Sequence, residues 1–367
     1  MVESEVVGNP TFSRARGRRS ASRLRAYLGS HLQNAGIYVF LISLASLYYL
    51  LNGPILLAHY DLGWHLAAGD VIRQQGSIPF HDPWSFTSGS QRWFNVSWLG
   101  DVVDSVIFQY AKLGGLTLFV VFCGAVIVVY LASACLCLGA SPLAAWISVL
   151  CACLLYPAFA TVPTIYLSAS PNIYTMVFAT ISYVECLKRS RRIFLLQAVM
   201  VLWANLHGGF VLGLPIVGVF LGAAVLKRDW GNARNYSIVL GACFAATFVN
   251  PLGWHIYQGV TTTVGHFVQA YIDEWLPYYH NIELPGSIPG IVYILVFVAL
   301  EVRAGKAGPL EPRLLSWIFL ILGLYQFRYL SFFLYSRRCR WPCISTGFCP
   351  DGSKISGGRD RYWPPGS

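Results

Sequence analysis

Charged side chains are scarce in this chain. Asp, Glu, Lys and Arg make up 11% of its 367 residues, and hydrophobic residues make up 56%. Soluble domains carry about 25% charged residues, so a chain of this length with so little charge cannot cover a soluble surface. The formal net charge of +10 could indicate a nucleic-acid partner. The basic residues, however, cluster beside apolar segments, where they act as topology signals. The composition therefore predicts an integral membrane protein, with membrane lipids and not nucleic acid as its surroundings.

The ten cysteines lack any metal-binding spacing. Most of them lie in apolar segments, where Cys behaves as a small hydrophobe. The start of the chain also lacks the pattern of a cleavable signal sequence. Six Arg lie between Arg14 and Arg25, and the apolar run 37–57 that follows them is too long for a signal peptide. That run is typical of a retained membrane anchor.

Apolar segments long enough to cross a membrane recur along the chain. We expect an all-α polytopic membrane protein with about nine transmembrane helices. The expected spans lie near residues 35–58, 113–138, 142–163, 172–187, 193–226 (two crossings), 236–254, 287–302 and 314–335. Three regions follow from this: a cytoplasmic Arg-rich tail (1–33), a transmembrane domain (34–336) and an irregular polar tail (337–367), to which we assign no function.

The charges of the connecting loops predict the orientation of the chain. Basic residues fill loops 188–192, 227–235 and 303–313, which places these loops and the N-terminus in the cytoplasm of a multi-pass protein of the inner (plasma) membrane. Loops 59–112, 164–171, 206–209 and 257–286 then lie outside. Loop 59–112 is long and is expected to carry two interfacial helices, Leu62–Gln74 and Ser97–Ala111.

Acidic and imidazole side chains gather on the predicted outer side. Asp61 and His65 follow the first span and share one face of a helix, because they are four residues apart. Such a pair can act as a base, as metal ligands or as phosphate-binding groups; a helix cap with an interfacial His is the alternative. Asp82 precedes Pro83 and is either a turn former or a site residue.

Further candidates come from the later spans. His207 interrupts an apolar stretch beside two Gly residues and is either a satisfied core histidine or a site residue. Glu274 lies in an outer loop, and Arg328 lies inside the last span, where it can reach a lipid phosphate. Because each lies at the same membrane end, we expect His207 and Glu274 to approach Asp61 around one cavity.

Several motifs together carry a resemblance. They are Asp61-x-x-Trp64-His65, Pro79-x-x-Asp82-Pro83-Trp84-Ser85-Phe86-Thr87, Trp203-Ala204-Asn205-Leu206-His207-Gly208, Asn250-Pro251-x-Gly253 and Glu274-Trp275. Over roughly residues 35–335 the chain resembles bacterial integral membrane glycosyltransferases of the GT-C type, among the members related to lipopolysaccharide-core and polyprenyl-phosphate-sugar transferases.

The resemblance implies a transferase that moves a sugar from a lipid-phosphate-linked donor to an acceptor on the outer face of the membrane. It implies that Asp61 is the catalytic or metal-binding carboxylate, with Asp82 or Glu274 as a second acid. His65 completes the catalytic set, and His207, Glu274 and Arg328 would bind substrate. A divalent cation, if one is used, would be held by Asp61 and His65.

Two other functions stay open. One is a carrier or flippase of lipid-linked saccharides, which should show polar residues near the middle of several spans and internal repeats. The sequence shows few such charges beyond Arg328 and no repeat. The other is an inactive relative that acts as an assembly partner. The sequence does not predict the sugar, the acceptor or the oligomeric state.

Overall fold

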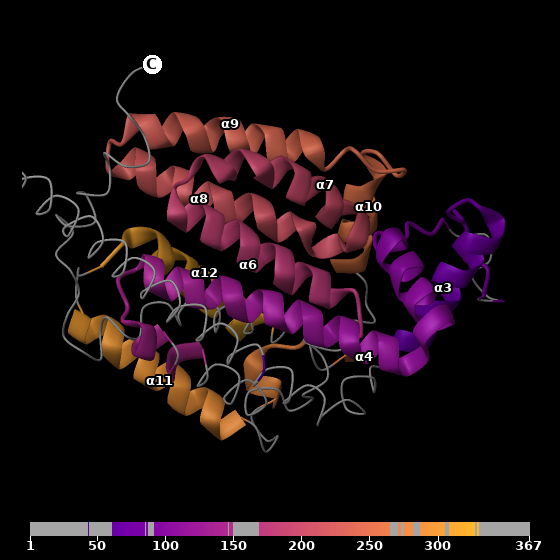
Figure 1. The fold of residues 1–367 in the computed structure, drawn as a ribbon, viewed down its shortest axis with the longest axis horizontal. Helices are drawn as coiled ribbons and strands as arrows, with labels where there is room; N and C mark the ends of the chain where they lie inside the picture. The colour runs from indigo at the N-terminus through magenta and orange to yellow at the C-terminus, as the bar shows by residue number, and fades with distance from the viewer. Residues whose placement is uncertain are drawn as a thin grey trace, which may run out of the picture.

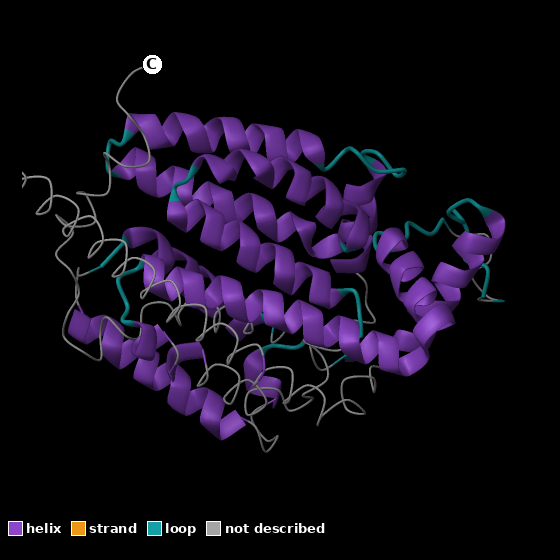
Figure 2. Ribbon diagram, viewed as in Figure 1, coloured by secondary structure: helices purple, strands orange, loops and turns teal. Residues whose placement is uncertain are grey.

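The computed structural model describes residues 43, 61–84, 86, 92–145, 147–149, 169–264, 271–272, 275–281, 287–304, 308–326 and 329. Helices dominate these ranges, as Figures 1 and 2 show, and the β-structure within them is one bridge between His81 and Arg92. The expected all-α class is therefore confirmed for the described part of the chain. The first predicted span (35–58, apart from Ser43), residues 150–163 of the predicted span 142–163, the tail 337–367, Glu274 and Arg328 lie outside the described residues.

Named helices follow one another in a simple order. They are α3 (Leu62–Gln75), α4 (Trp98–Cys137), α6 (Asn172–Lys188), η1 (Arg191–Leu195), α7 (Leu196–Leu206), η2 (Gly208–Leu212), α8 (Gly213–Leu226), α9 (Trp230–Ala246), α10 (His255–Val264), η5 (Tyr278–Asn281), α11 (Ser287–Ala304) and α12 (Leu310–Tyr325).

Helix α4 combines two parts of different character. Its backbone leaves the helical conformation at Lys112 (φ 53°, ψ −153°), which divides the helix into a first arm (98–111) and a second arm (113–137). The first arm buries polar side chains, among them Asp101 and Asp104, whereas the second arm buries mainly apolar ones. Helices are therefore found both where the interfacial helix 97–111 and where the span 113–138 were predicted, and they are joined at a break.

Within the described residues, two helical segments are long and apolar enough to cross a membrane, Trp98–Cys137 and Gly208–Leu226. Large apolar side chains are also exposed along α4, α11 and α12, such as Phe122, Val302 and Ile321. Apolar helix surfaces without a protein partner suit contact with lipid. These features indicate association with a membrane.

Consecutive helices run back and forth, so that the bundle has two ends of different chemistry (Figure 1). At one end, Arg189 after α6, Lys227 after α8 and Glu311 at the start of α12 make ion pairs. At the other end, Tyr174 at the start of α6 contacts the first arm of α4, and Asn205 at the end of α7 contacts Val249 after α9. We call these the basic end and the histidine end, the latter because His65, His207 and His255 lie there.

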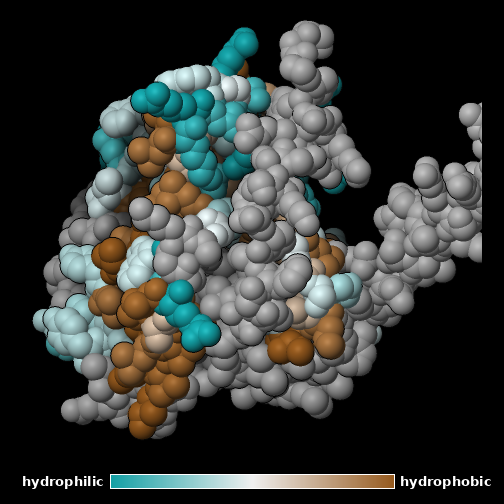
Figure 3. Space-filling view, turned by 90° about the vertical axis from the view of Figure 1, so that its left-hand side faces the viewer, coloured by the Kyte–Doolittle hydropathy of each residue, from teal (hydrophilic) through white to brown (hydrophobic). Residues whose placement is uncertain are grey.

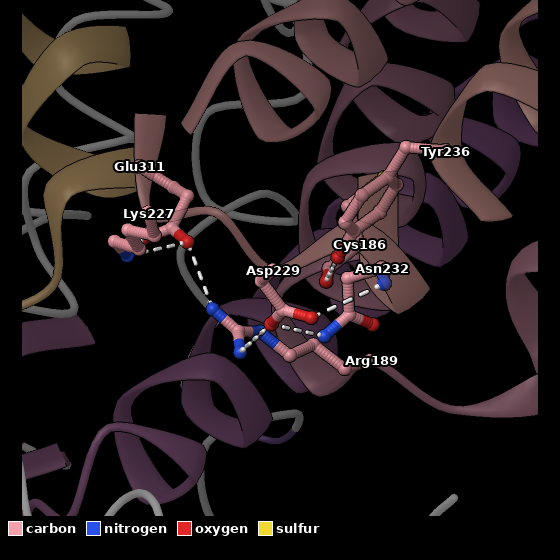
Figure 4. Close-up of polar contacts among 7 residues, drawn as sticks. All are labelled: Cys186, Arg189, Lys227, Asp229, Asn232, Tyr236 and Glu311. Carbon is pink, nitrogen blue, oxygen red and sulfur yellow. Dashed lines mark hydrogen bonds and ion pairs between the residues drawn. The ribbon is translucent and has the colours of Figure 1, made fainter. Parts of the chain in front are cut away.

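Charges at the basic end are paired across three elements (Figure 4). Glu311 is 4% exposed and accepts from Lys227 Nζ at 2.8 and 2.9 Å and from Arg189 at 2.8 Å. Asp229 caps the start of α9 by accepting from the backbone N–H of Asn232. Burial raises the pKa of Glu311, but its hydrogen bond with Lys227 and the nearby charges outweigh this, so that its pKa is lowered. Figure 3 looks onto this end and shows hydrophilic side chains in its upper part and hydrophobic ones below.

The middle of the chain folds as the expected pair of arms around a turn. The apolar stretch 193–226 forms helices α7 and α8, and the turn between them is at His207. One region differs from its prediction: 257–286 was expected to be a loop, but α10 occupies its beginning. That helix forms because Ile256 is buried and Gly259 lies against Phe94, which gives the segment an apolar partner.

Candidate functional site

A buried histidine–carboxylate pair lies where α3 meets the first arm of α4. Nδ1 of His65 and Oδ1 of Asp101 are 2.7 Å apart, and the two side chains are 16% and 2% exposed. The second carboxylate oxygen, Oδ2, accepts a hydrogen bond from Asn95 Nδ2 at 2.7 Å. The carboxylate therefore orients the imidazole and is itself held from the opposite side. We call His65 and Asp101 the dyad.

Local sequence explains how Asp101 is positioned. Asn95 precedes the first arm of α4, and its Oδ1 accepts from the backbone N–H of Ser97 at 2.9 Å, which closes a turn before the helix begins. Asp101 lies in the first turn of that helix, where a carboxylate is stabilised by the helix dipole. One side chain, Asn95, thus ties the helix start to the carboxylate.

A glycine sets the distance between the two helices. A Cβ atom at Gly69 would lie 2.1 Å from the backbone oxygen of Asp101 and 2.6 Å from Cβ of Ser105. Only glycine allows this approach. The dyad depends on it, because His65 lies one turn before Gly69 on α3.

The pKa of His65 reflects two opposing effects. Burial is the largest and would lower the pKa, because it disfavours the charged imidazolium. The hydrogen bond and the charge of Asp101, together with the charges of Asp61 and Asp104, outweigh burial and raise the pKa above the ordinary 6.5. Since Nδ1 faces the carboxylate, the neutral ring carries its basic lone pair on Nε2.

Further polar side chains extend along the same helix pair. Asp104 is 2% exposed, and its Oδ1 accepts from the hydroxyl of Tyr174 at 3.0 Å. The hydroxyl of Ser105 donates to Asp70 Oδ1 at 2.6 Å. The first arm of α4 therefore directs three polar side chains, Asp101, Asp104 and Ser105, toward α3 and α6.

A second histidine is held by a chain of hydrogen bonds. Nε1 of Trp203 donates to Thr175 Oγ1 at 3.0 Å, and Thr175 Oγ1 lies 2.6 Å from Nδ1 of His207. The backbone N–H of Gly209 also donates to that Nδ1, at 3.2 Å. Because Nδ1 accepts, the neutral ring carries its proton on Nε2. The arrangement fixes both the tautomer and the orientation of His207.

The two histidine groups belong to one end of the bundle. Tyr174 contacts Asp104 while the next residue, Thr175, contacts His207. A Cβ atom at Gly100, the residue before Asp101, would lie 2.6 Å from the backbone oxygen of Leu206. Leu206, the residue before His207, therefore contacts the segment that carries Asp101. The expected gathering of His207, Glu274 and Asp61 around one cavity stays a prediction, because Glu274 lies outside the described residues.

Other predicted site residues take different places. Asp61 is exposed at the N-cap of α3, where its side chain makes no capping hydrogen bond, and it reaches His65 through its charge. The carboxylate of Asp82 accepts from the backbone N–H of Trp84 at 2.9 Å, which is the geometry of a turn former. Trp84 packs edge-on against Trp64, with ring centroids 4.6 Å apart.

The described residues do not form a metal site. Within the described ranges, no three His, Cys, Asp or Glu side chains lie together as a possible ligand set. The two residues predicted as possible metal ligands, Asp61 and His65, have different surroundings. Asp61 is exposed, whereas Nδ1 of His65 faces Asp101. We therefore derive no chemical step through a metal ion.

Sequence reasoning missed the residue that contacts His65 directly. Asp101 is 36 positions away from His65, and none of the motifs that we singled out in the sequence includes it. A signal was present: Asp101 and Asp104 are three residues apart on a helix that is otherwise mostly apolar, so both carboxylates face the same side. Two acids on one face of such a helix mark a candidate site.

Comparison of the chain with known protein families, with curated proteins and with solved structures found no match.

Proposed function

We propose that the chain is a membrane glycosyltransferase in which the dyad acts as the general base. The observation that carries the proposal is the 2.7 Å contact between His65 and Asp101, with the carboxylate held from behind by Asn95. An imidazole whose Nδ1 is held by a carboxylate presents a basic Nε2 to a substrate. Burial alone would lower the pKa of His65, but the hydrogen bond and charge of Asp101 help to raise it above the ordinary 6.5. The resemblance to GT-C transferases supplies the substrate class, a sugar on a polyprenyl phosphate.

The chemistry is a single displacement. Nε2 of His65 takes the proton of an acceptor hydroxyl, and the acceptor oxygen forms a bond to the anomeric carbon of the sugar. The bond from that carbon to the phosphate oxygen breaks, and the lipid phosphate leaves with the electron pair. The configuration of the carbon is inverted. Asp101 stabilises the imidazolium, which then returns its proton to the phosphate or to water.

Topology supports an outward site. The basic end carries Lys188, Arg189 and Lys227, the signals that favour the cytoplasm. The dyad lies at the opposite end, which is then the outer one, where a lipid-linked donor and an outer acceptor can meet. The proposal therefore includes a cytoplasmic N-terminus and a multi-pass chain of about nine spans in the inner membrane.

The direct test is transfer of radiolabelled sugar from a polyprenyl-phosphate donor by the purified protein. His65→Ala and Asp101→Asn should each reduce transfer by about 10²–10⁴-fold, the usual contribution of a general base. His255→Ala is a matched control, because that histidine also lies at the histidine end but stacks on Phe94 (ring centroids 5.6 Å apart). Equal activity of native protein and His65→Ala would refute the proposed base.

One observation favours a carrier instead. Asp101 and Asp104 are buried between helices together with Tyr174, and buried carboxylates inside a helix bundle are used for proton coupling in transporters. A carrier would move a lipid-linked saccharide across the membrane of a vesicle without transferring the sugar to an acceptor. Flipping that persists in native protein and stops in Asp104→Asn, with no transfer in either, would select this function.

A further inference from the structure

A polar cavity lies farther along the two helices that carry the dyad. It has a volume of about 420 Å³ and opens between α3 and the first arm of α4. Its lining residues are Asp70, Arg73, Gln74, Ser105, Phe108, Gln109 and Lys112. This volume lies within the range of small-ligand sites, about 300–1,000 Å³. The cavity is separate from the dyad, whose two residues do not line it.

Positive charge prevails in this cavity. Arg73 and Lys112 face one acid, Asp70, so the formal balance is one positive charge. The acid is already engaged, because Asp70 Oδ1 accepts from Ser105 at 2.6 Å and from Arg73 at 3.3 Å. Among the described residues, Lys112 makes no ion pair and lies 5.5 Å from the centroid of the Phe108 ring. One cation of the cavity is thus left without a carboxylate.

The guanidinium of Arg73 is held in place before any ligand arrives. It donates to Ser105 Oγ at 2.9 Å, to Asp70 and to Gln109 Oε1. A side chain fixed by three acceptors loses little conformational entropy when it binds an anion. Arg73 is therefore preorganised, whereas Lys112 adds a second positive charge to the lining of the cavity.

The backbone at Lys112 is strained. Its φ of 53° with ψ of −153° is a combination that residues other than glycine rarely adopt. Gly114, two residues farther along the chain, could adopt this backbone conformation without such strain if the break lay there. Strain of this kind persists where the surrounding structure enforces it, and it gathers at binding sites. Here it brings the ammonium of Lys112 to the cavity.

The cavity also lies at a boundary of polarity. Directly after Lys112 begins the apolar second arm of α4, with Leu113 49% exposed and Leu118 61% exposed. Tyr110, just before it, is 79% exposed, as expected for an aromatic residue at a membrane–water interface. Phosphate groups of lipids occupy this level of a membrane.

We propose that the cavity between α3 and α4 binds the phosphate of an anionic membrane phospholipid, through Arg73 and Lys112. The acyl chains would follow the apolar surface of the second arm. This inference goes beyond the proposed sugar transfer and does not depend on it, because a bound phospholipid would stabilise the packing of α3 on α4 whether or not the dyad is catalytic.

The test is the thermal unfolding of the full chain in neutral detergent. A ligand that binds the folded state raises the unfolding midpoint by mass action. Phosphatidylglycerol should raise the midpoint of native protein, whereas phosphatidylcholine should raise it less. Lys112→Gln should weaken phosphatidylglycerol binding by about 10–100-fold, which corresponds to one charge-assisted hydrogen bond. Arg92→Gln is the matched control: it removes a cation from the same loop outside the cavity and should respond like native protein.

Two further variants separate charge from backbone effects. Lys112→Arg keeps the charge and should keep the response. Lys112→Gly relieves the strained backbone, so its midpoint without lipid should rise while its response to phosphatidylglycerol is lost. An equal response of native protein and Lys112→Gln would overturn the proposal. An equal effect of inorganic phosphate at the same concentration would overturn the assignment to a lipid.

Discussion

Replacing Asp101 by Asn removes the charge of the dyad and keeps the size of the side chain. Nδ1 of His65 and Oδ1 of Asp101 are 2.7 Å apart, and both groups are mostly buried. The imidazolium and carboxylate charges are spread over their rings and oxygens, so their centres are about 4 Å apart. At that distance an effective dielectric constant of about 20 gives roughly 4 kcal/mol of stabilisation. At about 1.36 kcal/mol per tenfold change in rate, the expected loss is about 10³-fold.

The pH dependence of the same variant separates catalysis from structure. A base must be neutral to work, so transfer by native protein should rise with pH through the pKa of His65, which lies above the ordinary 6.5. Without the charge of Asp101, burial dominates and lowers that pKa. The acidic limb of the rate profile should therefore move to lower pH in Asp101→Asn. A purely structural role for Asp101 would lower the rate and leave the limb in place.

The control for this experiment is Asp61→Asn. Asp61 is exposed and acts on His65 only through its charge, which water screens. We expect a loss of less than about tenfold and a small shift of the limb in the same direction. A profile in which Asp61→Asn abolishes transfer while Asp101→Asn leaves it intact would refute the dyad and restore Asp61 as the catalytic carboxylate.

Three more predictions follow from the packing and the charges. Gly69→Ala should separate α3 from α4 and cost about 1–3 kcal/mol of stability, whereas Gly63→Ala, where a Cβ atom meets nothing within 4 Å, should be harmless in transfer and unfolding assays. Glu311→Gln should lower the unfolding midpoint, and because Lys227 is 39% exposed, solvent screening limits the loss to about 1–2 kcal/mol. Glu311 has a lowered pKa, so its contribution is complete above the ordinary pKa of 4.5 and is lost as the pH falls through the lowered value; a Glu311→Gln midpoint that is as acid-sensitive as the native one would contradict this. Ser90→Cys should react with an impermeant thiol reagent from the outside of intact cells, and labelling from the cytoplasm alone would reverse the predicted topology.

Local patterns predicted more of this structure than distant contacts. The helix over 62–74 and the helix over 97–111 were expected from their amphipathic sequence, and they are found at Leu62–Gln75 and in the first arm of α4. The break at Lys112 was expected only as the end of a loop. The helix after the break was expected as the apolar span 113–138, but its direct continuation from the first arm was not, because that depends on the packing of both arms.

In the candidate site, too, the local pattern was predicted and the contacts between distant residues were not. Asp61 and His65 were singled out because they are close in the sequence, but the carboxylate in contact with His65 is Asp101. The pair forms because Gly69 lets α3 and the first arm of α4 approach closely, and this is a property of the fold. The link from Thr175 to His207 spans 32 positions and was equally hidden.

The two ends of the bundle use their buried carboxylates differently, and the difference argues for function at the histidine end. A buried charge must be compensated, or the protein loses stability. At the basic end, Glu311 is compensated by Arg189 and Lys227, whose charges persist at every physiological pH; such a cluster is suited to holding helices together. At the histidine end, Asp101 is compensated by an amide and by a histidine, a side chain that can gain or lose a proton. A structural role alone would be served better by a permanent cation there. A titratable partner makes the site less stable at high pH, but it allows the site to exchange a proton with a substrate, as a general base requires.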